Sequence, residues 1–136
     1  MHLLSNPAEW ETLSEFVDAS GKITDAHGES VIKFEENKII NESWVDFGGN
    51  CLKNHYLIEK LSERSYKYAS SNPALGIQQG VFNIDRNIIF SKFFIIGSEL
   101  NGFEIITRTG DKCLVNGALY KGSDLINTWN AVMKKK

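Results

Sequence analysis

Short runs in which apolar and polar residues alternate recur along this chain from residue 10 to residue 120, and short polar turns separate them. Alternation with a period of two places every second side chain on the same face of an extended strand. One such run puts Ile32 and Phe34 on one face and Lys33 on the other. Since the connections are short and join successive runs, the pattern predicts an antiparallel up-and-down meander.

The alternation predicts about nine or ten strands, bounded by clusters of glycine, asparagine, aspartate and serine. The strands expected before the C-terminal segment are residues 10–18, 30–35, 38–47, 54–61, 65–70, 77–84, 88–96, 103–108 and 112–120. A two-sheet sandwich could hold this number of strands. However, nearly every connection joins neighbours, which favours an up-and-down barrel. A barrel of eight or more strands has an interior wide enough for side chains or one small ligand.

Several expected turns depend on glycine or proline. Residues 25–28 (Asp-Ala-His-Gly) and residues 48–50 (Gly-Gly-Asn) are predicted to break the chain. Asn101–Gly102 gives the strongest hairpin signal, because a type I′ turn needs positive φ at both positions. Pro73 cannot donate a hydrogen bond to a ladder, so strand pairing is expected to stop there.

Residues 88–96 carry apolar side chains at nearly every position. Ile89 and Phe93 share one face, while Phe90 and Phe94 share the other. A strand of this kind is predicted to be covered on both sides.

The C-terminal segment, residues 123–136, fits two structures. Leu125, Trp129 and Val132 form a helical stripe behind a cap at Ser123 or Asp124. A strand face would instead be formed by Leu125, Asn127, Trp129, Ala131 and Met133. We favour the strand, because a meander is stabilised when its two edges pair.

Composition limits the function classes that this chain can belong to. Hydrophobic residues make up 42% and charged residues 24% of the 136, which is typical of one globular domain spanning residues 1–136. The net charge is −2, and the only basic run is Lys134–Lys136. Nucleic-acid binding requires a concentrated positive face, so we do not expect it. No apolar run approaches the ~20 residues of a membrane span.

Residues 1–7 lack the basic start of a signal peptide, which predicts a cytoplasmic protein. Cys51 and Cys113 lie far apart in the sequence and are expected to be reduced thiols.

The chain resembles the calycin group of lipocalin-like barrels, in a small bacterial form. The resemblance rests on the early Trp10 in Pro-Ala-Glu-Trp-Glu, on residues 18–22 and 34–39 leading to Trp44, and on the final segment around Trp129. Lipocalins usually carry a glycine two places before the first tryptophan, where this chain has Ala8, and an arginine late in the barrel that stacks on that tryptophan. This chain has no arginine after Arg108. The resemblance implies an all-β, antiparallel up-and-down meander closed into a lipocalin-like barrel.

Catalytic and metal motifs are not found. Some calycin-like barrels bind haem through a histidine near the C-terminus, but His2, His27 and His55 all lie in the first half of the chain. The scattered histidines and cysteines do not have zinc spacing either. Cys51 and His55 would be about 13 Å apart on a strand, too far to form a nucleophile–base pair. We therefore predict no catalytic residue, no metal and no cofactor.

The ligand-binding candidates are the residues that a barrel interior could present. The predicted wall is aromatic, and its members are Trp44, Tyr56, Tyr66, Tyr68 and Phe94, with Phe82 and Phe90 lining or filling the interior. Gln79 and Arg108 could orient the polar end of a ligand. Glu42 would point inward if it shares the inner face with Trp44, and would then need a cation such as Arg108. Otherwise Glu42 is solvated, and a packed core remains the alternative for the aromatic side chains.

Three functions follow from this architecture. The first is non-enzymatic binding of a small apolar or amphipathic molecule inside the barrel. The second is a homodimerising interaction module with a packed interior. The third is an enzyme that uses the same cavity with Glu42 as base. The sequence favours them in this order.

Overall fold

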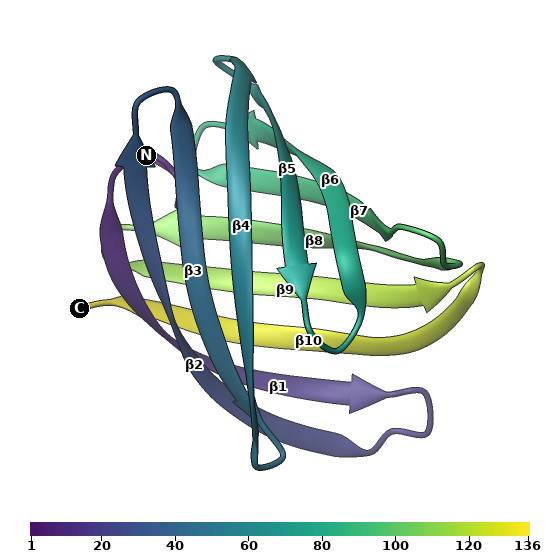
Figure 1. The fold of residues 1–136 in the computed structure, drawn as a ribbon. Coiled ribbons are helices and arrows are strands. Elements are labelled where there is room, and N and C mark those ends of the chain that lie inside the picture. Colours follow the sequence, from purple (N-terminus) through teal and green to yellow (C-terminus); the bar gives the residue numbers. More distant parts are fainter.

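In the computed structural model, which describes residues 1–136, each strand pairs with the next one in the sequence, and the last strand pairs with the first (Figure 1). All pairs are antiparallel, and no helix is present. The predicted all-β meander barrel is therefore confirmed. The strands are β1 (Ala8–Asp18), β2 (Ile23–Glu35), β3 (Lys38–Phe47), β4 (Asn50–Ser62), β5 (Ser65–Asn72), β6 (Gly76–Asp85), β7 (Ile88–Ile95), β8 (Leu100–Thr109), β9 (Lys112–Lys121) and β10 (Asp124–Lys135).

The C-terminal segment closes the barrel as a strand. β10 pairs with β1 from Trp10↔Lys135 to Asp18↔Asn127, and with β9 on its other side. Closure pairs the backbone groups that an open meander would leave free at both edges. The helical interpretation of residues 123–136 is therefore wrong.

Two of the expected turns lie inside strands. Residues 25–28 belong to β2, and Asn101–Gly102 belongs to β8. The β7–β8 turn comes earlier, at residues 96–99, where Gly97 has φ of 74°. Gly102 faces inward instead, because a Cβ there would lie 2.5 Å from Cζ of Phe93 and 2.3 Å from the carbonyl oxygen of Ala118. Gly102 is therefore required by close packing against Phe93 and not by a turn.

β7 is covered on one side only. Ile89, Phe93 and the residues between them alternate inward and outward, and the outer Phe90 and Phe94 are 44% and 50% exposed. The prediction of cover on both faces is wrong, because a closed single-layer barrel has no second layer over its outer surface.

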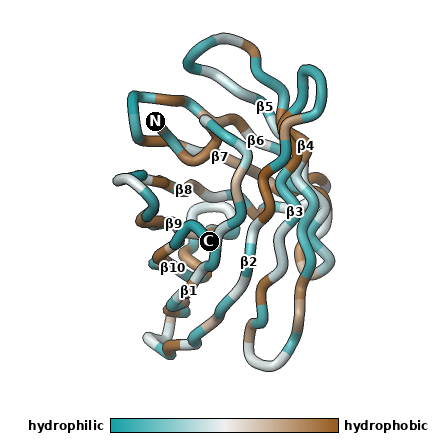
Figure 2. Tube along the Cα trace, turned by 90° about the vertical axis from the view of Figure 1, so that its left-hand side faces the viewer, coloured by the Kyte–Doolittle hydropathy of each residue, from teal (hydrophilic) through white to brown (hydrophobic).

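Both chain termini lie at the side of the barrel that faces the viewer in Figure 2. Side chains of the hydrophobic core pack together at this end. Leu3 and Leu4, which precede β1, are buried beside Trp10, whose side chain is fully buried. The guanidinium carbon of Arg108 lies 5.1 Å from the centre of the Trp10 ring. Arg108 also donates hydrogen bonds to the carbonyl oxygens of Gly110 and His2, at 2.8 and 3.1 Å. Arg108, the last arginine of the sequence, therefore stacks on the first tryptophan.

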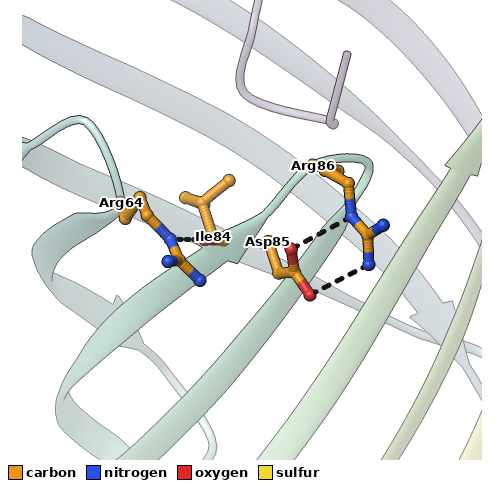
Figure 3. A network of polar contacts seen from close by, with 4 residues as sticks. All are labelled: Arg64, Ile84, Asp85 and Arg86. Carbon is orange, nitrogen blue, oxygen red and sulfur yellow. Dashed lines mark hydrogen bonds and ion pairs between the residues drawn. The ribbon is translucent and has the colours of Figure 1, made fainter.

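The turns at this end are linked to each other. Arg64, in the β4–β5 turn, donates from Nε to the carbonyl oxygen of Ile84 at 3.1 Å (Figure 3). The backbone N–H of Ile84 donates in return to the carbonyl oxygen of Arg64 at 2.9 Å. The neighbouring Arg86 pairs with Asp85 on the surface. The contacts between Arg64 and Ile84 therefore connect the β4–β5 turn to the end of β6 at the packed end of the barrel.

Candidate ligand-binding site

The barrel interior holds a partly open cavity of about 470 Å³, and most of the side chains that line it are hydrophobic. Leu3 and Leu4 form its floor at the packed end, and Ala74 and Leu75 of the β5–β6 turn lie at the other end. The volume falls within the roughly 300–1,000 Å³ range of ligand pockets. A solidly packed interior is therefore excluded.

The two walls of the cavity differ in polarity. The wall on β6 to β9 is mainly apolar, and its inward side chains include Phe82, Ile89, Phe93, Ile106, Val115 and Leu119. The wall on β1 to β4 is mixed: apolar side chains such as Phe16, Phe47 and Leu52 line it together with short polar ones, namely Thr12, Ser14, Ser30, Asn41, Ser43 and Asn54. Both sets follow from the alternation of each strand, because every second residue faces the interior.

Several polar atoms of this interior have no hydrogen-bond partner in the protein. The side-chain oxygens of Asn41, Asn54 and Asn127 are all buried and unpaired, and all three residues line the cavity. Buried polar groups are normally satisfied, so such atoms call for a partner that the chain itself does not supply. They are acceptors, which suits water or a ligand that carries hydrogen-bond donors.

A carboxyl group lies on the apolar side of the cavity. Glu104 of β8 and Trp129 of β10 both pair with Gly117 of the intervening strand β9. The indole Nε1 of Trp129 donates to Oε2 of Glu104 at 2.8 Å. A Cβ at Gly117 would lie 2.3 Å from the Trp129 ring, so only glycine lets the indole lie across β9 to reach the carboxyl group. Burial raises the pKa of Glu104, and the hydrogen bond from Trp129 opposes that shift.

A tyrosine cluster lies beside this carboxyl group. The hydroxyl of Tyr68 accepts a hydrogen bond from Nε2 of Gln78 at 3.1 Å and lies 3.3 Å from the hydroxyl of Ser91, which pairs with Glu104 across β7 and β8. The Tyr56 and Tyr68 rings are 5.6 Å apart. Burial raises the pKa of Tyr68 to about 12, and burial and then the Glu104 carboxyl group raise the pKa of Tyr56. Both phenols are therefore neutral hydrogen-bonding groups.

The structure brings some of the predicted residues to the cavity. Tyr56 and Tyr68 line it, and Trp44 is also part of its wall. The Trp44 ring, however, packs edge-on against the exposed His27, with ring centres 5.6 Å apart. Tyr66 is buried nearer the packed end, where its ring contacts His2.

Four other predicted residues lie elsewhere. Gln79 and Phe94 face outward, and their neighbours Gln78 and Phe93 line the cavity in their place. Arg108 is buried against Trp10 and does not line the cavity. The inward position considered for Glu42 is wrong.

The Glu42 side chain is 53% exposed on the outer face, where Lys33 and His55 lie 3.7 and 3.8 Å away. A base inside the barrel therefore cannot be Glu42. No group of three or more His, Cys, Asp or Glu side chains is placed to hold a metal ion.

Sequence reasoning missed Glu104 and the asparagines. Along β8, Phe103 and Ile105 share one face, and Gly102 and Glu104 share the other. The face with Phe103 and Ile105 is the more apolar of the two, yet it points outward. Hydrophobicity therefore selects the wrong face. The one available signal was the series of glycines opposite aromatic residues, because an inward glycine makes room for a ring from the next strand.

Comparison with known proteins supports the fold. No family model and no curated protein sequence matches this chain. Two solved structures are similar to it: Rv2717c from M. tuberculosis, with a TM-score of 0.76, and the S-type phycobiliprotein lyase CPES from Guillardia theta, with a TM-score of 0.70. Each is 9% identical in sequence. The alignments cover 95% of this chain in both cases, and 91% and 87% of the two other chains.

The strand order and the two similar structures define the fold of this protein as a closed, ten-stranded, lipocalin-like barrel. At 9% identity the two neighbours establish this fold and nothing finer. No helix in the structure has the length and apolar character needed to cross a membrane.

Proposed function

We propose that this protein binds a small, partly apolar molecule inside its barrel without transforming it. The observation that carries the proposal is the cavity of about 470 Å³, whose lining is mostly hydrophobic and includes a few polar side chains. Apolar surface supplies affinity, while a few placed polar groups fix the orientation of a ligand. The neighbour from Guillardia theta is named as a phycobiliprotein lyase, which is consistent with the handling of small molecules by barrels of this shape.

Native mass spectrometry of protein purified from a bacterial host tests this proposal. We expect an added mass that disappears when the same sample is denatured, or binding of naphthalenemethanol added to the purified protein. Ser43→Phe should abolish both, because residue 43 faces inward between Ser30 and Asn54. Glu42→Phe, one residue away on the outer face, is the matched control and should bind normally. Equal binding by both variants would contradict an interior site.

A second candidate is an interaction module, and the outer surface favours it. Phe90, Phe94 and Phe103 of β7 and β8 are 40–50% exposed, and Phe90 pairs with Ile105 on the same face. Exposed apolar surface of this kind often marks a contact with another protein. The packed interior that this alternative expected is not present. Sedimentation equilibrium tests the contact: a dimer that Phe103→Ser dissociates supports it, and a monomer at all concentrations contradicts it.

A further inference from the structure

The cavity contains an acidic group without a cationic partner. No lysine, arginine or histidine lines the cavity. Of the two acidic residues at its wall, Glu29 is already paired on the outside with Nζ of Lys136 at 2.5 Å. Glu104 has no ion pair and accepts a single hydrogen bond, from Trp129 to Oε2. Its other oxygen, Oε1, forms no hydrogen bond with the protein.

Residues on three neighbouring strands hold the Glu104 side chain in position. Gly117 leaves the room that the Trp129 indole needs, and the indole holds the carboxyl group from one side. Ser91 lies next to Glu104 on the other side, and its hydroxyl is engaged with Tyr68. An apolar core residue at position 104 would need none of these arrangements. The surroundings therefore fix a carboxyl group with one oxygen free.

Glu104 is partly buried, and a carboxylate withdrawn from water without a cation is destabilised, so it either takes up a proton or pairs with a positive charge. The groups that face Glu104 cannot supply that charge, because Tyr56 and Tyr68 are phenols, Ser91 and Trp129 are neutral, and Gly117 has no side chain. A ligand is the remaining source of a cation inside the barrel.

We infer that the cavity selects amines: a protonated nitrogen of the ligand pairs with Oε1 of Glu104, and the apolar body of the ligand lies against the wall formed by β6 to β9. The inference rests on the proposed function, because it names the ligand class for the same cavity. The free oxygens of Asn41, Asn54 and Asn127 suit it as well, since they can accept hydrogen bonds from N–H groups but offer no charge to an acidic ligand.

The test compares two probes that differ only in the polar group, naphthylmethylamine and naphthalenemethanol of the same isomer, by isothermal titration calorimetry at neutral pH. We expect wild-type protein to bind the amine about tenfold more tightly than the alcohol, as a desolvated charge pair would provide. Glu104→Gln should remove this preference, so that the amine and the alcohol bind with similar affinity. The glutamine keeps an oxygen that can accept the Trp129 hydrogen bond, so the substitution removes the charge and little else.

The outcomes separate the two proposals. If both probes bind with equal affinity, or if Glu104→Gln keeps the preference for the amine, the inference about amines is wrong while the proposed binding function stands. If neither probe binds and no native ligand is found, the proposed function itself fails.

A second measurement on wild-type protein covers the case in which the variant does not fold. Below the pKa of Glu104 the carboxyl group is neutral, whereas the amine stays charged. The affinity for the amine should therefore fall as the pH is lowered from 7 to 4, and the affinity for the alcohol should stay constant. Parallel pH profiles for the two probes would overturn the inference, because Tyr56 and Tyr68 do not titrate in this range.

Discussion

The packed end and the cavity of this barrel are built from the same strands, yet they satisfy their polar groups differently. At the packed end, Arg108 is buried, but its guanidinium group stacks on Trp10 and donates to two carbonyl oxygens. In the cavity, the oxygens of Asn41 and Asn54 have no partner in the protein. At the packed end Nε1 of Trp10 is also unpaired, but the residues with unpaired oxygens in the cavity line a space that a ligand can enter. This difference indicates which region stabilises the fold and which is available to a ligand.

The floor of the cavity belongs to both regions. Leu3 and Leu4 belong both to the packed core and to the cavity lining, so the N-terminal segment forms the boundary between the two regions. A substitution at the packed end should change the free energy of unfolding. A substitution in the cavity should change binding more than stability.

The largest effect is expected for Trp10→Ala at the packed end. The side chain is fully buried, so its removal leaves a large void, and the free energy of unfolding should fall by about 3–5 kcal/mol. Urea unfolding followed by circular dichroism measures the change. Leu13→Ala on the same strand is the control, because Leu13 is 67% exposed and should cost little. A small effect at Trp10 would mean that this end is not the source of stability.

Arg108→Lys should weaken the same end by about 1.5–3 kcal/mol, because an ammonium group cannot reproduce the stacking on Trp10 together with both hydrogen bonds. Arg86→Lys is the matched control, since Arg86 lies on the surface beside Asp85 and should change stability by less than about 1 kcal/mol. Thermal or urea unfolding of the two variants side by side gives the comparison. Equal values would show that the burial of Arg108 has no energetic consequence.

Gly117→Ala tests whether the contact between Trp129 and Glu104 at the cavity also contributes to stability. The added methyl group would lie 2.3 Å from the Trp129 ring, so the indole must move away from Glu104, and the free energy of unfolding should fall by about 1–3 kcal/mol. Trp129→Leu together with Gly117→Ala should cost less than the sum of the two single substitutions, because the two residues interact directly. Additive effects would indicate that the methyl group is accommodated in some other way.

The meander could be predicted from the sequence, but the faces of its strands could not. Alternation and short turns are local properties, so the number of strands and the barrel follow from them. Which face is inside depends on the register of the whole barrel, and a shift by one residue exchanges the faces. For this reason the sequence predicts Gln79 and Phe94 at the cavity, whereas Gln78 and Phe93 line it in the structure.

Tyr56 and Tyr68 could be predicted at the cavity, because aromatic side chains line or fill a barrel interior and a buried tyrosine hydroxyl needs a partner. The same reasoning also selects Tyr66, which is buried nearer the packed end. Glu104 was missed because an acidic residue is ordinarily assigned to the surface. Its inward position depends on Gly117 and Trp129, which come from two other strands. Such a contact between strands has no counterpart in the local pattern of the sequence.

The smallest effect expected in the cavity is on the pH dependence of stability. Burial raises the pKa of Glu104 above its ordinary value of 4.5, so the folded protein holds that proton more tightly than the unfolded chain does. Stability from this group is therefore complete below pH 4.5 and is lost as the pH rises through the higher pKa of the folded state. Glu104→Gln removes the titration, so the stability of the variant relative to wild type should increase from pH 4 to pH 7. Urea unfolding midpoints of both proteins measured over this range give the comparison. A parallel change in the two proteins would contradict a partly buried carboxyl group without a cation. If an added amine abolished the difference between them, the same experiment would connect the incomplete region of the barrel to its ligand.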